Sequence, residues 1–235
     1  MRLHFRLTPN DHLVPWDYLP NLTGWLHGRL GEREDLHEGT SLYSMSDLTH
    51  GRVRRGKLDF EGGSSFFLSS HRDDVLVELM ASLMKRPITR DERDPRRVAW
   101  GMYVEEVTME RTPEFGDTTT FWAKSPVLVR EQRSDGGRDH VLFGEEKADE
   151  LLTRTLHWKQ QQAGLPQVGA MRFDRSYAKA KSKLIEYKGI KNRASLCPVI
   201  VEGGPEVCAF AWNVGAGHST GVGFGALEVM TRTPG

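Results

Sequence analysis

The sequence predicts an α+β protein made of two tandem domains, each with the order strand, helix, strand, strand, helix, strand. Three observations lead to this prediction. Over the first half of the chain, the hydrophobic pattern switches between a period of two and a period near 3.6 in that order. The same element order returns in the second half, without visible sequence identity between the halves. The length of 235 residues suits two domains of about 100–150 residues.

The first half supplies one complete βαββαβ set, which is the order of the ferredoxin-like (RRM-like) fold. Leu3, Phe5 and Leu7 alternate with polar residues and predict a half-buried strand. Leucines at helical spacing then predict a helix over 15–30. The remaining predicted elements are strands at 42–45 and 64–70 joined by a basic loop, a helix from Val75 to Met84 stopped by Pro87, and a strand over 98–109.

The second half repeats the pattern with more turns between its elements. β-prone segments occur at 118–123 and 127–130, and another at 141–143 follows a Gly136-Gly137 turn. A helix is predicted over 145–162 with Trp158 on its inner face, and a short helix over 205–214 has Pro205 in its first turn. Extended segments are predicted at 168–176, 199–201 and 224–230. We therefore place the first domain at 1–115 and the second at 116–235.

The charge of the chain is balanced overall but segregated locally. Its formal net charge is zero, which argues mildly against a nucleic-acid binder. Between Arg172 and Arg193, however, eight basic residues face two acidic ones, a local excess of six positive charges. Such segregation predicts a basic patch on a neutral protein.

Other features of the sequence argue against disulfide-bonded, metal-binding, secreted and membrane-spanning proteins. Cys197 and Cys208 do not form a C-x-x-C pair, so we interpret them as reduced core residues. No clustered ligand spacing suggests a metal, and nothing suggests a cofactor. The first residues lack an apolar signal-peptide core, and no run approaches the roughly 18 apolar residues of a membrane span. We expect a cytoplasmic protein.

A glycine-rich segment near the C-terminus is the most informative motif. Residues 215–225 read Gly-Ala-Gly-His-Ser-Thr-Gly-Val-Gly-Phe-Gly. Glycines let a backbone adopt positive φ and approach a ligand closely, and consecutive amides of such a turn can converge on a phosphate. The segment is neither a P-loop nor a dinucleotide fingerprint. A tight connector without a ligand is the alternative.

The spacing of this segment resembles the C-terminal loop of the CRISPR-associated repeat-RNA-binding superfamily. Its pattern is G-x-G, five residues, then G-Φ-G, matched by Gly215, Gly217, Gly223, Phe224 and Gly225. The Ser125-Pro126-Val127 step is similar to the one that opens the second domain of the precursor-CRISPR-RNA-processing endoribonucleases. The segment 36–39 and the strand behind it resemble their catalytic histidine region, with His37 at the histidine position. The segment departs from the family in one respect. Family loops often carry lysine or arginine between the glycine pairs, whereas His218 is the one residue there that could be positively charged in this sequence.

The resemblance implies a metal-independent endoribonuclease that cuts CRISPR repeat RNA in the precursor transcript to make guide RNAs. RNA carries its own nucleophile, the 2′-hydroxyl, so cleavage needs proton transfer and charge stabilisation and leaves 2′,3′-cyclic phosphate and 5′-hydroxyl ends. A histidine with a pKa near ~6.5 can transfer these protons at neutral pH. We take His37 as the catalytic candidate and His27 as the reserve. The alternative without a functional role is a solvated loop histidine for His37 and a residue at the edge of the core for His27.

Neighbouring residues complete the predicted site. Tyr43, Ser41 and Arg29 are candidate partners of the histidine by proximity in sequence. Tyr18, Trp25 and Arg29 share one flank of the first helix, which either faces RNA or packs in the core. The residues that we expect to bind RNA are Gly215, Gly217, His218, Gly221, Gly223, Gly225, Lys181, Lys183, Lys188, Lys191 and Arg193.

Two other functions remain open at this point. A non-catalytic RNA-binding subunit of a CRISPR effector complex shares the loop and the fold but needs no histidine. A small-molecule-binding pair of ferredoxin-like domains leaves the glycine loop and the basic stretch unexplained. Contacts with other effector subunits and a homodimer are also left open.

Overall fold

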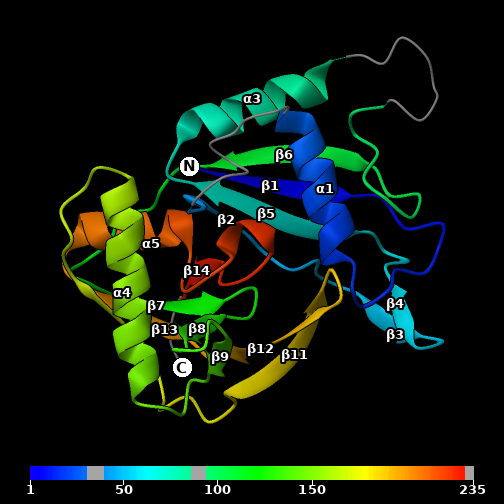
Figure 1. The fold of residues 1–235 in the computed structure, drawn as a ribbon. Coiled ribbons are helices and arrows are strands. Elements are labelled where there is room, and N and C mark those ends of the chain that lie inside the picture. The colour runs from blue at the N-terminus through cyan, green and yellow to red at the C-terminus, as the bar shows by residue number, and fades with distance from the viewer. Residues whose placement is uncertain (31–39, 86–93, 231–235) are drawn as a thin grey trace.

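The computed structural model describes residues 1–30, 40–85 and 94–230. Its first domain is a four-stranded antiparallel sheet in the order β2-β5-β1-β6. The strands are β1 (Arg2–Leu7), β2 (Tyr43–Met45), β5 (Ser64–Ser70) and β6 (Val104–Glu110). Helices α1 (Leu19–Leu30) and α3 (Asp73–Met84) lie over one face of this sheet (Figure 1). A small hairpin of β3 (Arg52–Arg54) and β4 (Lys57–Asp59) is inserted between β2 and β5.

The second domain repeats this topology. Its sheet has the order β10-β13-β7-β14, which places its strands as in the first sheet. The strands are β7 (Thr118–Ala123), β10 (Ala170–Phe173), β13 (Val199–Glu202) and β14 (Leu227–Val229), and the helices are α4 (Lys147–Gln162) and α5 (Pro205–Val214). The predicted class, two tandem ferredoxin-like βαββαβ domains, is confirmed. The predicted boundary at residue 115 falls between β6 and β7 and stays a prediction.

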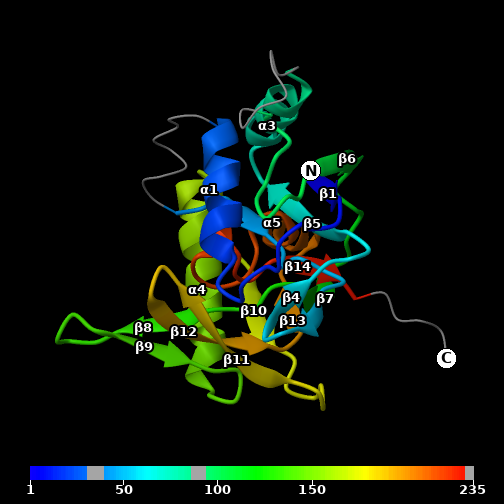
Figure 2. The same cartoon turned by 90° about the vertical axis from the view of Figure 1, so that its right-hand side faces the viewer.

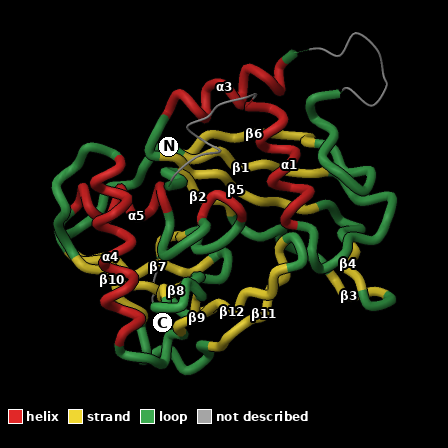
Figure 3. Tube along the Cα trace, in the orientation of Figure 1, coloured by secondary structure: helices red, strands yellow, loops and turns green. Residues whose placement is uncertain are grey.

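Two hairpins extend the second domain. Strands β8 (Val129–Gln132) and β9 (Arg138–Val141) form one, which projects from the body of the molecule (Figure 2). Strands β11 (Lys181–Tyr187) and β12 (Ile190–Leu196) form the other. This second hairpin runs toward the α1 end of the first domain (Figure 3). It contains most of the basic stretch, for which the hydrophobic pattern predicted no secondary structure.

Element ends differ from the predictions where local backbone geometry intervenes. The first helix begins at Leu19 rather than residue 15, because Val14 is still extended and pairs with Leu58. The strand predicted over 98–109 begins at Val104, because Trp100 and Gly101 have φ of 53° and 79° and form a turn. The predicted stop of α3 at Pro87 lies outside the described residues.

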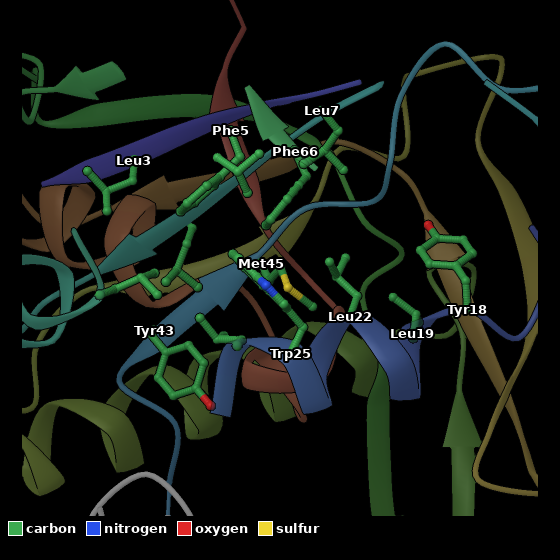
Figure 4. Packing of buried hydrophobic residues seen from close by; sticks show 14 of the residues in the cluster. Leu3, Phe5, Leu7, Tyr18, Leu19, Leu22, Trp25, Tyr43, Met45 and Phe66 are labelled. Atoms are coloured by element: carbon green, nitrogen blue, oxygen red, sulfur yellow. The ribbon is translucent and has the colours of Figure 1, made fainter. Parts of the chain in front are cut away.

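Two hydrophobic cores meet at the domain interface. The first gathers Phe5, Trp25 and Phe66 between its sheet and α1, with the Phe5 and Phe66 rings stacked 4.7 Å apart (Figure 4). Leu128 and Phe224 of the second domain belong to this same cluster. The packing therefore fixes the glycine-rich segment against the first domain. No described helix is long and apolar enough to cross a membrane.

Candidate functional site

A cleft of 760 Å³ lies where the two domains meet. Its walls come from α1, the start of β2, α4, the two hairpins of the second domain and the glycine-rich segment. The lining residues that carry polar chemistry are Thr23, His27, Thr40, Ser41, Tyr43, Arg130, Arg154, Thr155, Trp158, Lys159, Tyr187, Lys188, His218, Ser219 and Thr220. Packing of one domain on the other therefore brings together side chains that are far apart in the sequence.

The charge of this cleft is positive, although the chain as a whole is neutral. Arg130, Arg154, Lys159 and Lys188 line it, and no aspartate or glutamate stands among the described lining residues. Arg130 donates hydrogen bonds through Nη2 to Asn192 Oδ1 at 2.7 Å and through Nη1 to Ser219 Oγ at 3.3 Å. Fixed cations without compensating carboxylates in a concave surface concentrate a positive potential, which attracts an anionic ligand.

His27 and Tyr43 form a hydrogen-bonded pair on one wall. His27 Nε2 lies 3.0 Å from the Tyr43 hydroxyl. Burial raises the pKa of Tyr43 to about 12, while a hydrogen bond with the Ser41 side chain acts in the opposite direction. The phenol is therefore neutral at physiological pH and can orient the imidazole. Figure 4 shows Tyr43 beside α1 at the edge of the core.

The glycine-rich segment owes its composition to close packing. Gly215, Gly217, Gly223 and Gly225 have φ between 63° and 94°, where other residues are strained. A Cβ on Gly223 would lie 2.6 Å from Leu19 Cδ2 of α1, and one on Gly221 would lie 2.7 Å from Tyr43 Cζ. The space beside these two glycines is thus filled by the first domain rather than left open for a phosphate. Their predicted contact with RNA stays a prediction.

His218 lines the cleft as a neutral side chain. Burial, followed by the nearby cations Lys159 and Arg130, lowers its pKa to about 4. Its Nδ1 accepts a hydrogen bond from the Arg130 amide at 3.2 Å, which places the ring proton on Nε2. The one loop residue that could have been positive is therefore neutral at neutral pH, and its predicted contact with RNA stays a prediction. Its Nε2–H remains a donor.

Lys159 ties the wall of the cleft to the glycine-rich segment. Its Nζ donates to the carbonyls of Val214 and Gly215 at 2.9 and 3.1 Å, and to Thr220 Oγ1 at 3.3 Å. Thr220 Oγ1 in turn donates to the carbonyl of Tyr43 at 2.8 Å. A continuous set of hydrogen bonds thus links α4 to the strand that carries Tyr43.

The structure brings only some of the predicted site residues together. Ser41, Tyr43, Lys188, Gly217 and His218 line the cleft together. Arg29 does not: its pKa is lowered by burial and it interacts electrostatically with Asp94 on the other side of α1. His37 lies outside the described residues.

The flank of α1 that contains Tyr18 and Trp25 belongs to the core. Trp25 is 6% exposed, and its Nε1 donates to the Pro95 carbonyl at 3.3 Å. Tyr18 is also buried and accepts a hydrogen bond from the Leu48 amide. The packing interpretation of this flank is therefore confirmed, and the side of α1 that faces the cleft is the opposite one.

The basic stretch does not form one surface. Lys188, at the tip of the β11–β12 hairpin, lines the cleft, whereas Lys183 pairs with Asp47 at 3.6 Å. Strand alternation places Lys181 and Lys183 on the face opposite to Lys191 and Arg193. Contacts between RNA and these four residues stay predictions.

Sequence reasoning missed Arg130, Arg154, Trp158 and Lys159. Three of them lie on one helix, where Arg154 and Trp158 are four residues apart and share an exposed face. That spacing was visible in the sequence, but the helical pattern predicted Trp158 as an inward residue, whereas it is 52% exposed. Nothing in the sequence joined this helix to the glycine-rich segment.

Within the described residues, those suited to metal binding are dispersed. No group of three or more His, Cys, Asp or Glu side chains in the described part of the chain could hold a metal ion. The donors that line the cleft are instead cations, hydroxyls and imidazoles, which bind anions well. The chemistry that this donor set favours is recognition of a phosphate and transfer of protons.

Residues 110–229 match the family described as CRISPR associated protein Cas6, C-terminal. The match covers just over half of the chain. The chain belongs to the Cas6 family. No protein of curated function matches it in sequence. The resemblance to the repeat-RNA-binding superfamily, drawn from the glycine spacing, is thereby confirmed.

Solved structures with the same fold include several Cas6 relatives. A Cas6-related gene product from Pyrococcus furiosus is 18% identical, with a TM-score of 0.83 over 99% of both chains. An RAMP protein binding different RNA substrates is 17% identical, with a TM-score of 0.81 over 98% of this chain and 100% of that one. A Cas6 product complex from Thermus thermophilus is 13% identical, with a TM-score of 0.68 over 97% and 99% of the two chains. These likenesses establish the fold of this Cas6-family chain.

Proposed function

We propose that this Cas6-family chain is an endoribonuclease that cleaves CRISPR repeat RNA in the precursor transcript to make guide RNAs. The observation that carries the proposal is the cleft, whose described lining holds no carboxylate and combines several cations with the His27–Tyr43 pair. Among its structural neighbours are a protein that binds different RNA substrates and a Cas6 product complex, which supports RNA as the ligand.

The proposed reaction uses the nucleophile that RNA carries. The 2′-oxygen upstream of the cut attacks the adjacent phosphorus, the bond from phosphorus to the 5′-oxygen breaks, and the products are a 2′,3′-cyclic phosphate and a 5′-hydroxyl. A base accepts the 2′-hydroxyl proton, and an acid donates a proton to the leaving 5′-oxygen. Arg130, Arg154 and Lys188 stabilise the charge that develops on the phosphate oxygens.

We propose His37 as the principal proton-transfer residue, as the resemblance implies, with Ser41 and Tyr43 as its neighbours. His37 precedes Thr40 of the cleft wall by three residues in the sequence. His27 is the second candidate, and its place in the cleft beside Tyr43 gives it more support than its sequence did. Arg29 receives no support from the geometry.

Single-turnover cleavage of labelled CRISPR repeat RNA in excess EDTA tests the proposal. We expect one cut site, no dependence on metal, and no cutting when the 2′-hydroxyl upstream of that site is replaced by hydrogen. His37→Ala should slow cleavage by about 10²–10⁴-fold with RNA affinity nearly unchanged. Arg29→Ala is the matched control and should cut at the parental rate.

Each alternative has its own outcome in this experiment. Protection of the RNA without cutting would identify the chain as a non-catalytic RNA-binding subunit. Loss of cutting in His27→Ala but not in His37→Ala would move the proton transfer to His27. Cutting of the deoxy substrate would falsify the mechanism.

A further inference from the structure

Trp158 is a large aromatic side chain left exposed at the edge of the cleft. It projects from α4 and is 52% exposed. The side chain lines both the cleft and a second hollow of 340 Å³ farther along the helix. A ligand that extends from the cleft into this hollow therefore passes over the indole.

The indole is held in place from the opposite domain. Its Nε1 donates a hydrogen bond to Thr40 Oγ1, which lies just before β2. This contact fixes one edge of the ring, and the side chain nevertheless stays half-exposed. A fixed aromatic surface loses little conformational entropy when a flat ligand packs on it.

The surroundings of Trp158 fit a nucleotide. Arg154 precedes it by one helical turn and lines the same two hollows, and Gln161 follows it by three residues on the same exposed face. Aromatic faces beside cations are the usual platform for unpaired bases, because stacking needs the flat face of a base while the cation binds the phosphate. A base pair within a duplex does not offer that face.

We propose that Trp158 stacks on an unpaired base of the bound RNA and that Arg154 contacts the phosphate beside it. The inference rests on the proposed function for the identity of the ligand as RNA. It adds that the RNA segment which leaves the cleft over α4 is single-stranded.

The first test measures affinity on an RNA that cannot be cut. Labelled CRISPR repeat RNA of the source genome, with a 2′-deoxy substitution at the cut site, is titrated with the parent, Trp158→Ala and Trp158→Phe. Base–aromatic stacking is worth about 1–3 kcal/mol, so Trp158→Ala should weaken binding by about 5–150-fold and Trp158→Phe by much less. Tyr103→Ala is the control, because Tyr103 is an exposed aromatic residue that lines neither the cleft nor the second hollow.

The second test locates the stacked base. A series of the same RNA carries one abasic nucleotide, at a different position in each member. At one position the missing base should weaken binding by the parent but should have no effect on binding by Trp158→Ala. An equal loss at every position, or parental affinity in Trp158→Ala, would overturn the proposal. Thermal denaturation of the variants separates a loss of stacking from a loss of folding.

Failure of this inference is distinguishable from failure of the proposed function. Both affinity tests use uncut RNA, so a chain that binds without cutting still reveals whether Trp158 stacks. The affinities of the parent and Trp158→Ala are also measured for the same RNA annealed to its complement. If the duplex binds as tightly as the single strand and Trp158→Ala weakens both equally, the single-stranded assignment is wrong.

Discussion

Lys159 is a buried cation whose ammonium group donates to two carbonyls and a hydroxyl. The side chain is 4% exposed, and burial lowers its pKa to about 7. Because the unfolded chain holds this proton up to its ordinary pKa near ~10.4, the unfolded state binds more protons than the folded state between these two values. The contribution of Lys159 to folding stability therefore increases as pH rises above about 7 and is absent at lower pH.

We expect this titration to separate Lys159→Met from the parent. Between pH 6 and pH 9, the free energy of unfolding of the parent should rise relative to that of the variant, whose side chain does not titrate. Urea denaturation of both proteins at several pH values in this range measures the difference. A difference that stays constant with pH, or shrinks as pH rises, would contradict the lowered pKa.

The residues of the site show how far sequence alone reaches. Tyr43 and Ser41, which line the cleft, were predicted because they follow the predicted histidine segment closely in the sequence. His27 and Arg29 differ by two positions, which is a rotation of about 200° on a helix. Only the packing of α1 decides which of them faces the cleft, and that packing depends on distant strands. Lys159 and Arg130 were missed because their contacts cross more than fifty residues of chain.

At the scale of elements, the glycine-rich segment is an interface component. A substitution of Gly223 by alanine places a Cβ 2.6 Å from Leu19, which is 2% exposed and has little room to move. Overpacking and left-handed backbone strain together should cost about 2–5 kcal/mol. The loss of RNA affinity should accompany the loss of folding stability, because the added Cβ disturbs the packing of one domain on the other. Affinity should not fall in a variant that remains as stable as the parent.

Gly136→Ala is the matched control for this prediction. Gly136 has φ of 82°, similar to the 94° of Gly223, but an added Cβ there meets nothing within 4 Å. Only the backbone strain remains, about 1–2 kcal/mol. Urea denaturation and RNA titration of both variants complete the test. If Gly223→Ala folds as stably as Gly136→Ala and loses only RNA affinity, the glycine contacts the ligand after all.

Periodicity predicted the elements well and their insertions poorly. Strand 64–70 and helix 205–214 were predicted at their observed ends, because alternation, helical spacing and Pro205 mark them locally. The β3–β4 and β11–β12 hairpins occupy equivalent places in the two domains, between the second and third strands of each sheet. Their sequences are rich in lysine and arginine, so hydrophobic periodicity was too weak to show them as strands.

At the scale of the whole molecule, Arg2 joins the two domains. Its guanidinium lies 3.7 Å from the centre of the Phe67 ring in the first domain and 3.8 Å from that of Trp212 in the second. Its Nε donates to Ser69 Oγ at 2.6 Å, and its Nη2 donates to the carbonyl of Leu227. The side chain is 1% exposed, and burial lowers its pKa to about 10, so it stays charged.

Replacement of Arg2 should loosen the contact between the domains. Arg2→Met leaves buried carbonyls without a donor and removes both cation–ring contacts, which should cost about 2–5 kcal/mol. Arg2→Lys should recover little, because an ammonium cannot present the planar fork that lies between two rings. Chemical denaturation should show a lower midpoint and a broader transition, as the two domains begin to unfold separately. An unchanged midpoint in both variants would contradict this role.

The separation of charge across the molecule predicts where salt acts on RNA binding. Three cations of the cleft, Arg130, Arg154 and Lys188, are available to phosphates, and each phosphate contact on a single strand contributes about 0.7 to the slope of log affinity against log salt. The slope of log affinity against log salt for the parent should therefore be about −2 or steeper. Arg154→Gln and Lys188→Gln should each flatten it by about 0.7.

Arg172→Gln is the control for this measurement, because Arg172 pairs with Glu202 at 3.1 Å on β10 and β13, away from the cleft lining, and should leave the slope unchanged. A triple alanine variant of Lys181, Lys183 and Lys191 tests whether the RNA continues along the β11–β12 hairpin. Flatter slopes both in the cleft variants and in the triple alanine variant support one continuous RNA path from the cleft onto the hairpin. A change confined to the hairpin variant would mean that the neutral chain uses its basic stretch, rather than its cleft, to hold RNA.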